Sequence, residues 1–275
     1  MKVAFSQTIF ANVATHHGGS LTYLVADYDS DGWPQTGRNK ALDELRRAFA
    51  FHICGDQHLS TVVHHGIDNW NDACWSFCVP SIANFYPRAW NPSKPGKNRK
   101  EGMPNYTGEF LDGLGNYVTI LAATNPGKST SRRPAELHDK MPGYGIVRLN
   151  KEERTITMEC WPRYADPADP TTGSQYIGWP ITIKQTDNYG RKAVAYLPTI
   201  TVSGLTNPVI EVIDQESNEV LYTLRSKGSS YRPGVFKDGL YTVKIGEPGT
   251  TTKMKTLGSL QAIPPEKDST IELKF

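Results

Sequence analysis

The chain has 275 residues, of which 38% are hydrophobic and 21% charged, which is the composition of an ordinary globular protein. Its formal net charge of +2 at pH 7 is too small to indicate nucleic acid or an anionic membrane as a partner. No apolar run reaches the twenty residues of a membrane-spanning helix, and no signal peptide is visible, so the localisation does not follow from the sequence.

The first predicted helix covers residues 39–50 and leads directly into a predicted strand. Leu42, Leu45 and Phe49 recur at helical spacing, and charged residues occupy the other side of this segment. The apolar run 51–54 that follows is predicted to be a buried strand. A helix that leads into a buried strand is typical of α/β-type sheets, which carry their chemistry just beyond the carboxyl ends of the strands.

A glycine turn after that strand presents a carboxylate and an imidazole two residues apart. Asp56 and His58 could offer one oxygen and one nitrogen to the same metal ion or to adjacent ions. The alternative is structural: Asp56 caps the turn and His58 bonds a neighbouring group. The pattern alone does not decide between these interpretations.

Two other histidine pairs are weaker candidates. His64 and His65 are adjacent on an extended segment and should point to opposite faces, so at most one could face a site, and we expect a solvent-exposed pair. His16 and His17 precede two glycines and are predicted to lie in a flexible turn. The four cysteines, at positions 54, 74, 78 and 160, lack the spacing of a zinc site. Cys74 and Cys78 share one side of a strand-like segment and are predicted to be packed thiols.

The later elements are predicted to be β-strands. Residues 117–123 form a buried strand, and 144–149 with 154–161 form a hairpin. A linker with short strands covers 166–195, and 196–275 is predicted to be a small β-sandwich because short strands recur there between turns. Its predicted strands are 199–202, 209–213, 219–224, 240–245 and 270–275.

Four of these segments carry a family resemblance through their order and spacing. Residues 29–34, Arg38, the turn 55–58 and residues 79–84 resemble the C-terminal part of the alkaline phosphatase D (PhoD)-like metallophosphatases, within the calcineurin-like phosphoesterase superfamily. Residues 6–12 resemble the strand that precedes this block. The resemblance covers residues 1–165.

The resemblance implies an α+β chain: the C-terminal half of an α/β/β/α metallophosphatase sandwich, followed by the all-β sandwich. It implies hydrolysis of a phosphate mono- or diester with divalent or trivalent metal ions (Ca, Fe, Mn or Zn). Asp56 and His58 would be metal ligands. Arg38 would be a catalytic residue that contacts phosphate or, alternatively, a structural anchor. Asp29, Asp31 and Trp33 would lie in a loop that faces the site, although turn capping also explains the aspartates.

The sequence also departs from this family. The superfamily takes most of its metal ligands from an earlier half of the domain, and nothing before the turn 55–58 supplies that series. We therefore expect a truncated chain, or one completed by a separately encoded N-terminal half. The alternative function is a non-catalytic extracellular binding or attachment protein that uses the C-terminal β-sandwich. The family is usually exported.

Overall fold

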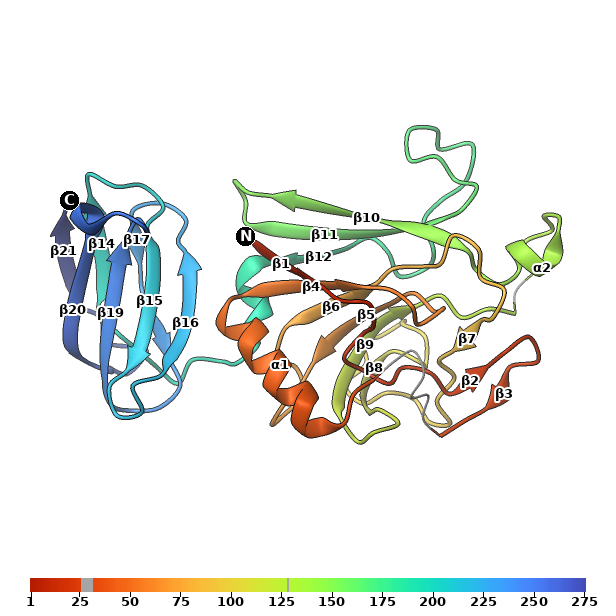
Figure 1. The fold of residues 1–275 in the computed structure, drawn as a ribbon, viewed down its shortest axis with the longest axis horizontal. Helices are drawn as coiled ribbons and strands as arrows, with labels where there is room; N and C mark the ends of the chain where they lie inside the picture. Colours follow the sequence, from red (N-terminus) through yellow and green to blue (C-terminus); the bar gives the residue numbers. More distant parts are fainter. Residues whose placement is uncertain (26–31, 128) are drawn as a thin grey trace.

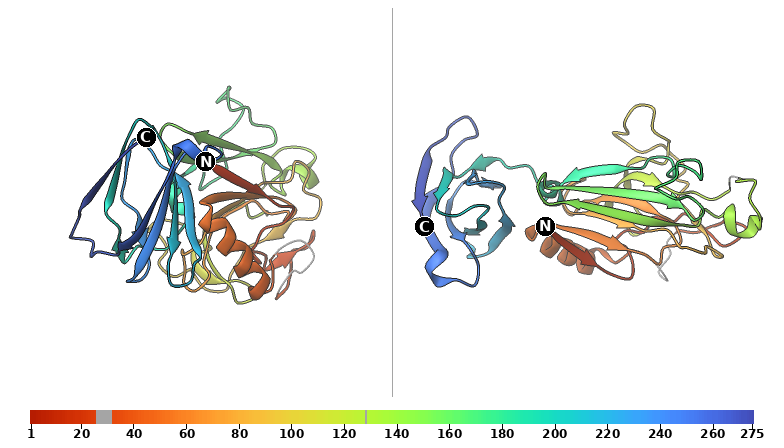
Figure 2. Two further views of the ribbon diagram at one scale, coloured as in Figure 1. Left: turned by 60° about the vertical axis from the view of Figure 1, so that its left-hand side comes forward. Right: turned by 90° about the horizontal axis from the view of Figure 1, so that it is seen from above.

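The computed structural model describes residues 1–25, 32–127 and 129–275, which form two bodies side by side (Figure 1). The larger body contains β1 to β12, and the smaller body contains β13 to β21. The N-terminus lies where the bodies meet, and the C-terminus lies on the smaller body (Figure 2). The predicted β-rich character is confirmed, because strands far outnumber helices among the described residues.

A six-stranded sheet forms the centre of the larger body. In spatial order its strands are β1 (Lys2–Phe5), β4 (Ala50–Cys54), β6 (Trp75–Cys78), β5 (Thr61–His65), β9 (Tyr117–Ala123) and β8 (Gly108–Leu111). The first three are parallel, and the remaining pairs are antiparallel. Parallel strands bring their carboxyl ends to one edge, so the segments that follow β1, β4 and β6 meet there.

The helix predicted at residues 39–50 is present but displaced toward the N-terminus. It is α1 (Gln35–Arg47), and it begins directly after Pro34, whose ring suits the entry to a helix. It ends before Phe49, whose φ of +51° is incompatible with a continuing helix. The strand expected to continue past Phe5 also ends early, because the Ser6 hydroxyl donates to the Thr8 carbonyl and turns the chain.

The predicted hairpin is confirmed and belongs to a second sheet that faces the first. Its strands are β10 (Gly143–Asn150), β11 (Thr155–Pro162) and β12 (Ile181–Lys184). Phe51 and Phe77 from the first sheet pack against Ile156 and Met158 from the second. Helix α1 lies against the other face of the first sheet, and within the described ranges no helix covers the outer face of the second (Figure 1).

Short elements surround this core. The strands β2 (His16–His17), β3 (Thr22–Tyr23) and β7 (Arg88–Ala89) form a small sheet, and α2 (Ala135–His138) and the 3₁₀-helix η1 (Gln185–Asn188) are single turns. The prediction of a flexible turn at His16 and His17 is therefore wrong. These residues are held by pairing with β7, which lies some seventy residues later and cannot be recognised from local sequence.

The smaller body has two main facing sheets that share one apolar core. One contains β16 (Val220–Arg225), β15 (Val209–Asp214), β19 (Leu240–Gly246) and β20 (Met254–Gln261), and the other contains β17 (Ser230–Tyr231), β14 (Thr199–Ser203) and β21 (Thr270–Lys274). The strands β13 (Ala195–Tyr196) and β18 (Gly234–Val235) form a separate pair, and the 3₁₀-helix η2 (Thr251–Lys253) precedes β20. The sequence did not predict β20, because this edge strand is largely exposed and lacks apolar alternation.

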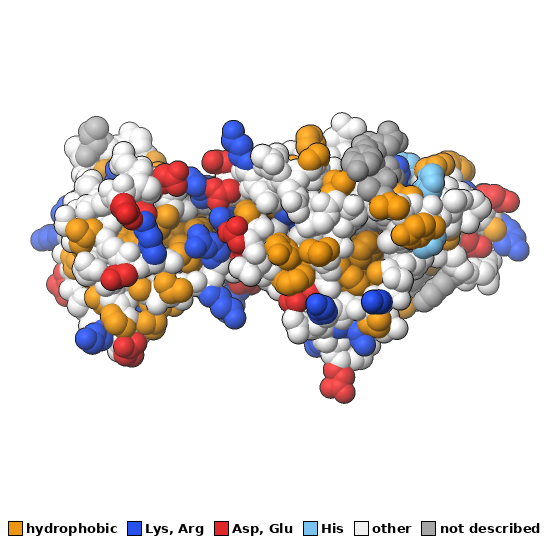
Figure 3. All heavy atoms as spheres, turned by 90° about the horizontal axis from the view of Figure 1, so that it is seen from below, with side chains coloured by type: hydrophobic (Ala, Val, Ile, Leu, Met, Phe, Trp, Pro, Cys, Tyr) orange, Lys and Arg blue, Asp and Glu red, His pale blue; other side chains and the backbone are white. Residues whose placement is uncertain are grey.

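An aromatic cluster and ion pairs connect the two bodies. Phe49 lies in the apolar core of the smaller body, beside Tyr189 and Tyr222. Arg47 lies 3.5 Å from Glu219, and Lys227 lies 3.2 Å from Glu153. Figure 3 shows acidic and basic side chains interspersed over the smaller body and its junction with the larger one. No helix in the described part of the chain is long and apolar enough to cross a membrane.

Candidate functional site

The turn between β4 and β5 carries the predicted metal ligands on an unusual backbone. Asp56 and His58 have φ values of +61° and +55°, in the left-handed region that non-glycine residues avoid. The fully buried Gln57 lies between them, where its Nε2 donates to Val13 O and its Oε1 accepts from Thr61. The buried glutamine therefore fixes the turn from inside. Strained backbone of this kind is concentrated at functional sites.

Two side chains at the turn, His58 and Asn84, each contribute a buried polar atom without a partner among the described residues. Asn84 Nδ2 donates to the carbonyls of His58, at 2.9 Å, and Lys140, at 2.8 Å. Among the described residues, His58 Nδ1 and Asn84 Oδ1 have no hydrogen-bond partner. Buried polar atoms rarely stay unpaired, so each of these two atoms is a candidate to bind a ligand. The structure thus brings residue 84, from the fourth segment of the sequence pattern, to the turn.

Asp56 is exposed and forms a hydrogen bond with Gln7, from the segment that follows β1. Gln7 Nε2 donates to Asp56 Oδ2 at 3.2 Å, and the Gln7 carbonyl accepts from Gly55 N at 3.0 Å. One side-chain and one backbone hydrogen bond therefore join the residues after β1 to the turn after β4. One carboxylate oxygen is positioned by this contact. Gln7 has no distinctive sequence signal, and only the pairing of β1 with β4 reveals its role.

Arg38 does not lie at this turn but is buried beneath the sheet. Its Nε donates to Phe10 O, its Nη1 to Asn39 Oδ1 and Gly66 O, and its Nη2 to His65 Nδ1 and Tyr117 O. These contacts use all five guanidinium N–H groups. Burial lowers the pKa of Arg38 to about 10. This geometry favours the structural anchor, because it leaves no guanidinium donor for a phosphate. Most of the groups that Arg38 holds are backbone carbonyls.

The remaining predicted site residues lie apart from this turn or outside the description. Asp29 and Asp31 fall in the segment 26–31, which lies outside the described residues. Trp33 is half-exposed, and its ring contacts Phe10. Within the described ranges, no three His, Cys, Asp or Glu side chains come together in a group that could hold a metal ion. A metal at the turn would therefore need donors of another kind as well. The Asn84 amide oxygen is one such donor.

The chain matches no known protein family. Neither protein-family models, nor curated proteins, nor solved structures gave a match. Its function is therefore inferred from its residues and their geometry.

The histidine pair after the turn is not solvent-exposed, and that prediction is wrong. His64 stacks on Trp75 with ring centroids 4.5 Å apart, whereas His65 points to the opposite face and is fully buried. The alternation of the two side chains is thus confirmed. Their burial arises because β5 lies in the interior of the sheet, between β6 and β9, and its own sequence could not reveal this position. The prediction of packed thiols at Cys74 and Cys78 is confirmed, since both are buried free cysteines.

His65 belongs to a chain of hydrogen bonds across three neighbouring strands. Its Nε2 lies 2.6 Å from Ser76 Oγ, and the same oxygen lies 2.7 Å from His52 Nδ1. His52 Nε2 lies 2.7 Å from Ser6 Oγ, whose hydroxyl donates to Thr8 O at 2.5 Å. These contacts form because the three residues share one face of β5, β6 and β4, where the register places His52 beside Ser76.

The two ends of this chain fix the direction of every bond in it. Arg38 can only donate, so His65 Nδ1 accepts from it, and His65 Nε2 must donate to Ser76. At the other end the Thr8 carbonyl can only accept, so Ser6 donates to it and accepts from His52 Nε2. Ser76 therefore donates to His52 Nδ1, and both histidines are neutral Nε2–H tautomers.

Burial agrees with this assignment of neutral histidines. It lowers the pKa of His52 to about 4 and the pKa of His65 well below its usual range, with Arg38 acting on His65 in the same direction. The chain ends at Ser6 and Thr8, on either side of Gln7, which contacts Asp56. It therefore connects the buried Arg38 anchor to the segment that positions the carboxylate. Spacing along the sequence gave no sign of this network.

Proposed function

We propose that this chain is a metal-dependent phosphoester hydrolase of the PhoD-like metallophosphatase type. The proposal rests on two buried atoms that have no partner among the described residues, His58 Nδ1 and Asn84 Oδ1, at the strained turn that bears Asp56. An imidazole nitrogen, a carboxylate oxygen and an amide oxygen suit manganese, iron, zinc or calcium ions, with the imidazole favouring the transition metals. These residues would supply three donors of suitable kinds, whereas the two-ion site of this class of enzyme requires several more.

The position of the turn also supports the proposal. Gly55 and the three residues after it follow the carboxyl end of β4, at the edge where β1 and β6 also end. Helix α1, the six-stranded sheet and the facing three-stranded sheet correspond to three of the four layers of an α/β/β/α sandwich. The smaller body, with its two facing sheets, corresponds to an accessory β-sandwich.

Each of these residues has a distinct task in the proposed reaction. His58 and Asp56, with Asn84, would hold the metal, and Gln7 would orient the Asp56 carboxylate through its 3.2 Å contact. Bound metal ions supply Lewis acidity for the attack of water on phosphorus. Further ligands would come from a separately encoded N-terminal half. The substrate is a phosphate mono- or diester.

Hydrolysis and metal content test the proposal together. The chain is assayed with p-nitrophenyl phosphate and bis(p-nitrophenyl) phosphate in the presence of Mn²⁺, Ca²⁺ or Fe³⁺, and retained metal is measured by elemental analysis. Asp56→Asn and His58→Ala should each lower metal affinity and turnover by about 100-fold or more, since even residues that only support ligands contribute about 10–100-fold.

His138→Ala is the matched control, because His138 also has a buried Nδ1 without a partner among the described residues but lies in α2. This variant should keep both metal content and turnover. The proposal is contradicted if the chain retains no metal and hydrolyses neither substrate with any of the three ions. That result would favour the alternative, a non-catalytic attachment protein that acts through its smaller body.

A further inference from the structure

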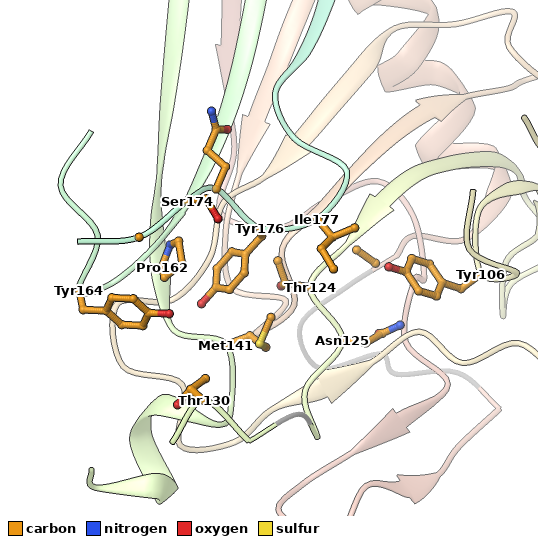
Figure 4. A pocket seen from close by; sticks show the side chains of 13 residues that line it. Tyr106, Thr124, Asn125, Thr130, Met141, Pro162, Tyr164, Ser174, Tyr176 and Ile177 are labelled. Atoms are coloured by element: carbon orange, nitrogen blue, oxygen red, sulfur yellow. The ribbon is translucent and has the colours of Figure 1, made fainter. Parts of the chain in front are cut away.

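A pocket with a volume of about 370 Å³ opens at the edge of the larger body where the Gly55 turn lies (Figure 4). Its walls come from the ends of β9 and β11, from Met141 before β10, and from residues 173–177. Two sets of hydrogen bonds connect these walls to the turn. Ser60 N donates to Thr124 Oγ1 at 3.1 Å. Asn84 Nδ2 donates both to the carbonyl of His58, in the turn, and to the carbonyl of Lys140, next to Met141.

Three tyrosine rings and small aliphatic groups form most of the pocket surface. Tyr106 lies at one end and Tyr164 at the other, and the hydroxyls of both point toward the space between them (Figure 4). Tyr176 lies between them, with its hydroxyl committed to Pro142 O at 2.7 Å. None of the described residues that line the pocket carries a charge, although the Arg132 guanidinium lies over the Tyr164 ring, with its Cζ 3.4 Å from the ring centroid. A cationic ligand would therefore lose its hydration there without gaining a countercharge.

The polar side-chain groups that remain free in the pocket are mainly hydroxyls. In the part of the chain that the structure describes, no hydrogen bond is formed by the side-chain oxygens of Tyr106, Tyr164 or Ser174. Asn125 Oδ1 accepts from Trp90 N and Asn125 Nδ2 donates to Trp90 O, whereas Gln175 Oε1 accepts from Cys160 N and, among the described residues, Gln175 Nε2 has no partner. A planar base, which is read through fixed donors and acceptors at its edge, would find only this one amide N–H₂ group not already in use.

Rotatable hydroxyls beside aromatic rings suit a ligand that has hydroxyl groups at its rim and C–H groups on its faces. A purely apolar ligand would leave the tyrosine hydroxyls without partners, at a cost in affinity. The pocket volume lies in the range of small-molecule sites. We propose that this pocket binds an uncharged hexopyranose ring, with Tyr106 and Tyr164 as its hydrogen-bonding residues.

Saturation-transfer NMR on the full-length chain tests this proposal without metal and without turnover, so its outcome is independent of the proposed hydrolase activity. The probes are methyl α-D-glucopyranoside, methyl α-D-mannopyranoside and methyl N-acetyl-β-D-glucosaminide at millimolar concentration, with adenosine as the competing class. At least one glycoside should receive saturation from the protein. Tyr106→Phe keeps the ring and removes the hydroxyl, and it should weaken that binding about two- to tenfold, as expected for one neutral hydrogen bond.

Tyr164→Ala removes a partly exposed ring from the pocket and should abolish the signal. Tyr23→Phe, on the exposed β3, is the matched control and should leave the affinity unchanged. Circular dichroism confirms that each variant is folded. The proposal is overturned if no glycoside receives saturation, if binding survives both pocket variants unchanged, or if adenosine alone binds.

Discussion

The ring of Phe49, at the end of α1, packs edge-to-face against Tyr222 of the smaller body, with ring centroids 5.4 Å apart. Phe49 adopts the left-handed backbone conformation that helices commonly use at their C-terminal boundary, where glycine is usual. The conformation costs conformational energy in a phenylalanine, and the packing of its ring against Tyr189 and Tyr222 offsets that cost. The larger body thus contributes a core residue to the smaller one.

Replacing Phe49 should weaken the chain as a whole. Phe49→Ala removes a side chain that is 5% exposed, and we expect the free energy of unfolding to fall by about 3–5 kcal/mol. Urea denaturation measures this loss. Phe85→Ala is the matched control, because Phe85 is 65% exposed and its loss should change stability by only about 0.5 kcal/mol. Equal effects of the two substitutions would show that Phe49 is not a core residue.

Stability should decrease in mild acid because of the buried histidines. Burial lowers the pKa of His52 to about 4 in the folded chain, so the unfolded chain binds more protons below about pH 6.5. Above that pH, His52 is neutral in both states and does not affect the free energy of unfolding. As the pH falls toward 4, protonation of His52 in the unfolded chain lowers this free energy by roughly 3 kcal/mol. His65 and His64 act in the same direction.

The measurement is the free energy of unfolding in urea at a series of pH values from 7 down to 4. His52→Gln cannot titrate in this range, so its stability should depend less steeply on pH than that of the unaltered chain. A pH dependence that is identical in the two proteins would contradict the assignment.

The direction of the hydrogen-bond chain predicts the tautomers of both histidines. Long-range ¹H–¹⁵N correlation spectra at neutral pH should show His52 and His65 as Nε2–H forms. Ser76→Ala should leave two buried ring nitrogens without partners and reduce stability by about 1–3 kcal/mol for each. Ser20→Ala, at an exposed position, is the control and should be neutral. An Nδ1–H form at either histidine would refute the assigned direction.

Arg38→Lys separates a structural role from a phosphate contact. A lysine cannot replace the guanidinium, which donates to the carbonyls of Phe10, Gly66 and Tyr117. We expect a loss of at least about 3 kcal/mol in the free energy of unfolding, because several buried carbonyls lose their donor. Unchanged stability together with weaker binding of inorganic phosphate, measured by calorimetry, would instead support the phosphate contact.

Local periodicity was sufficient to predict much of the secondary structure. The apolar run at 117–123 corresponds to β9 without any shift, and alternation predicted the hairpin of β10 and β11 to within about a residue at most boundaries. Helix α1 was predicted in type but was placed late, because Phe49 fits the apolar spacing of the helix and yet packs against the smaller body. The position of Asp56 and His58 on a turn after β4 also followed from the sequence.

The sequence by itself determined many of the helical and extended segments and where the glycine turn with its carboxylate and imidazole lies, because these depend on neighbours within a few residues. Only the tertiary structure decided that Asn84 reaches His58, that Gln7 reaches Asp56, and that His52, Ser76 and His65 form one directed chain. These contacts depend on strand order and register, which join residues up to fifty positions apart. No local pattern encodes such pairings, since many registers are compatible with the same alternation of side chains.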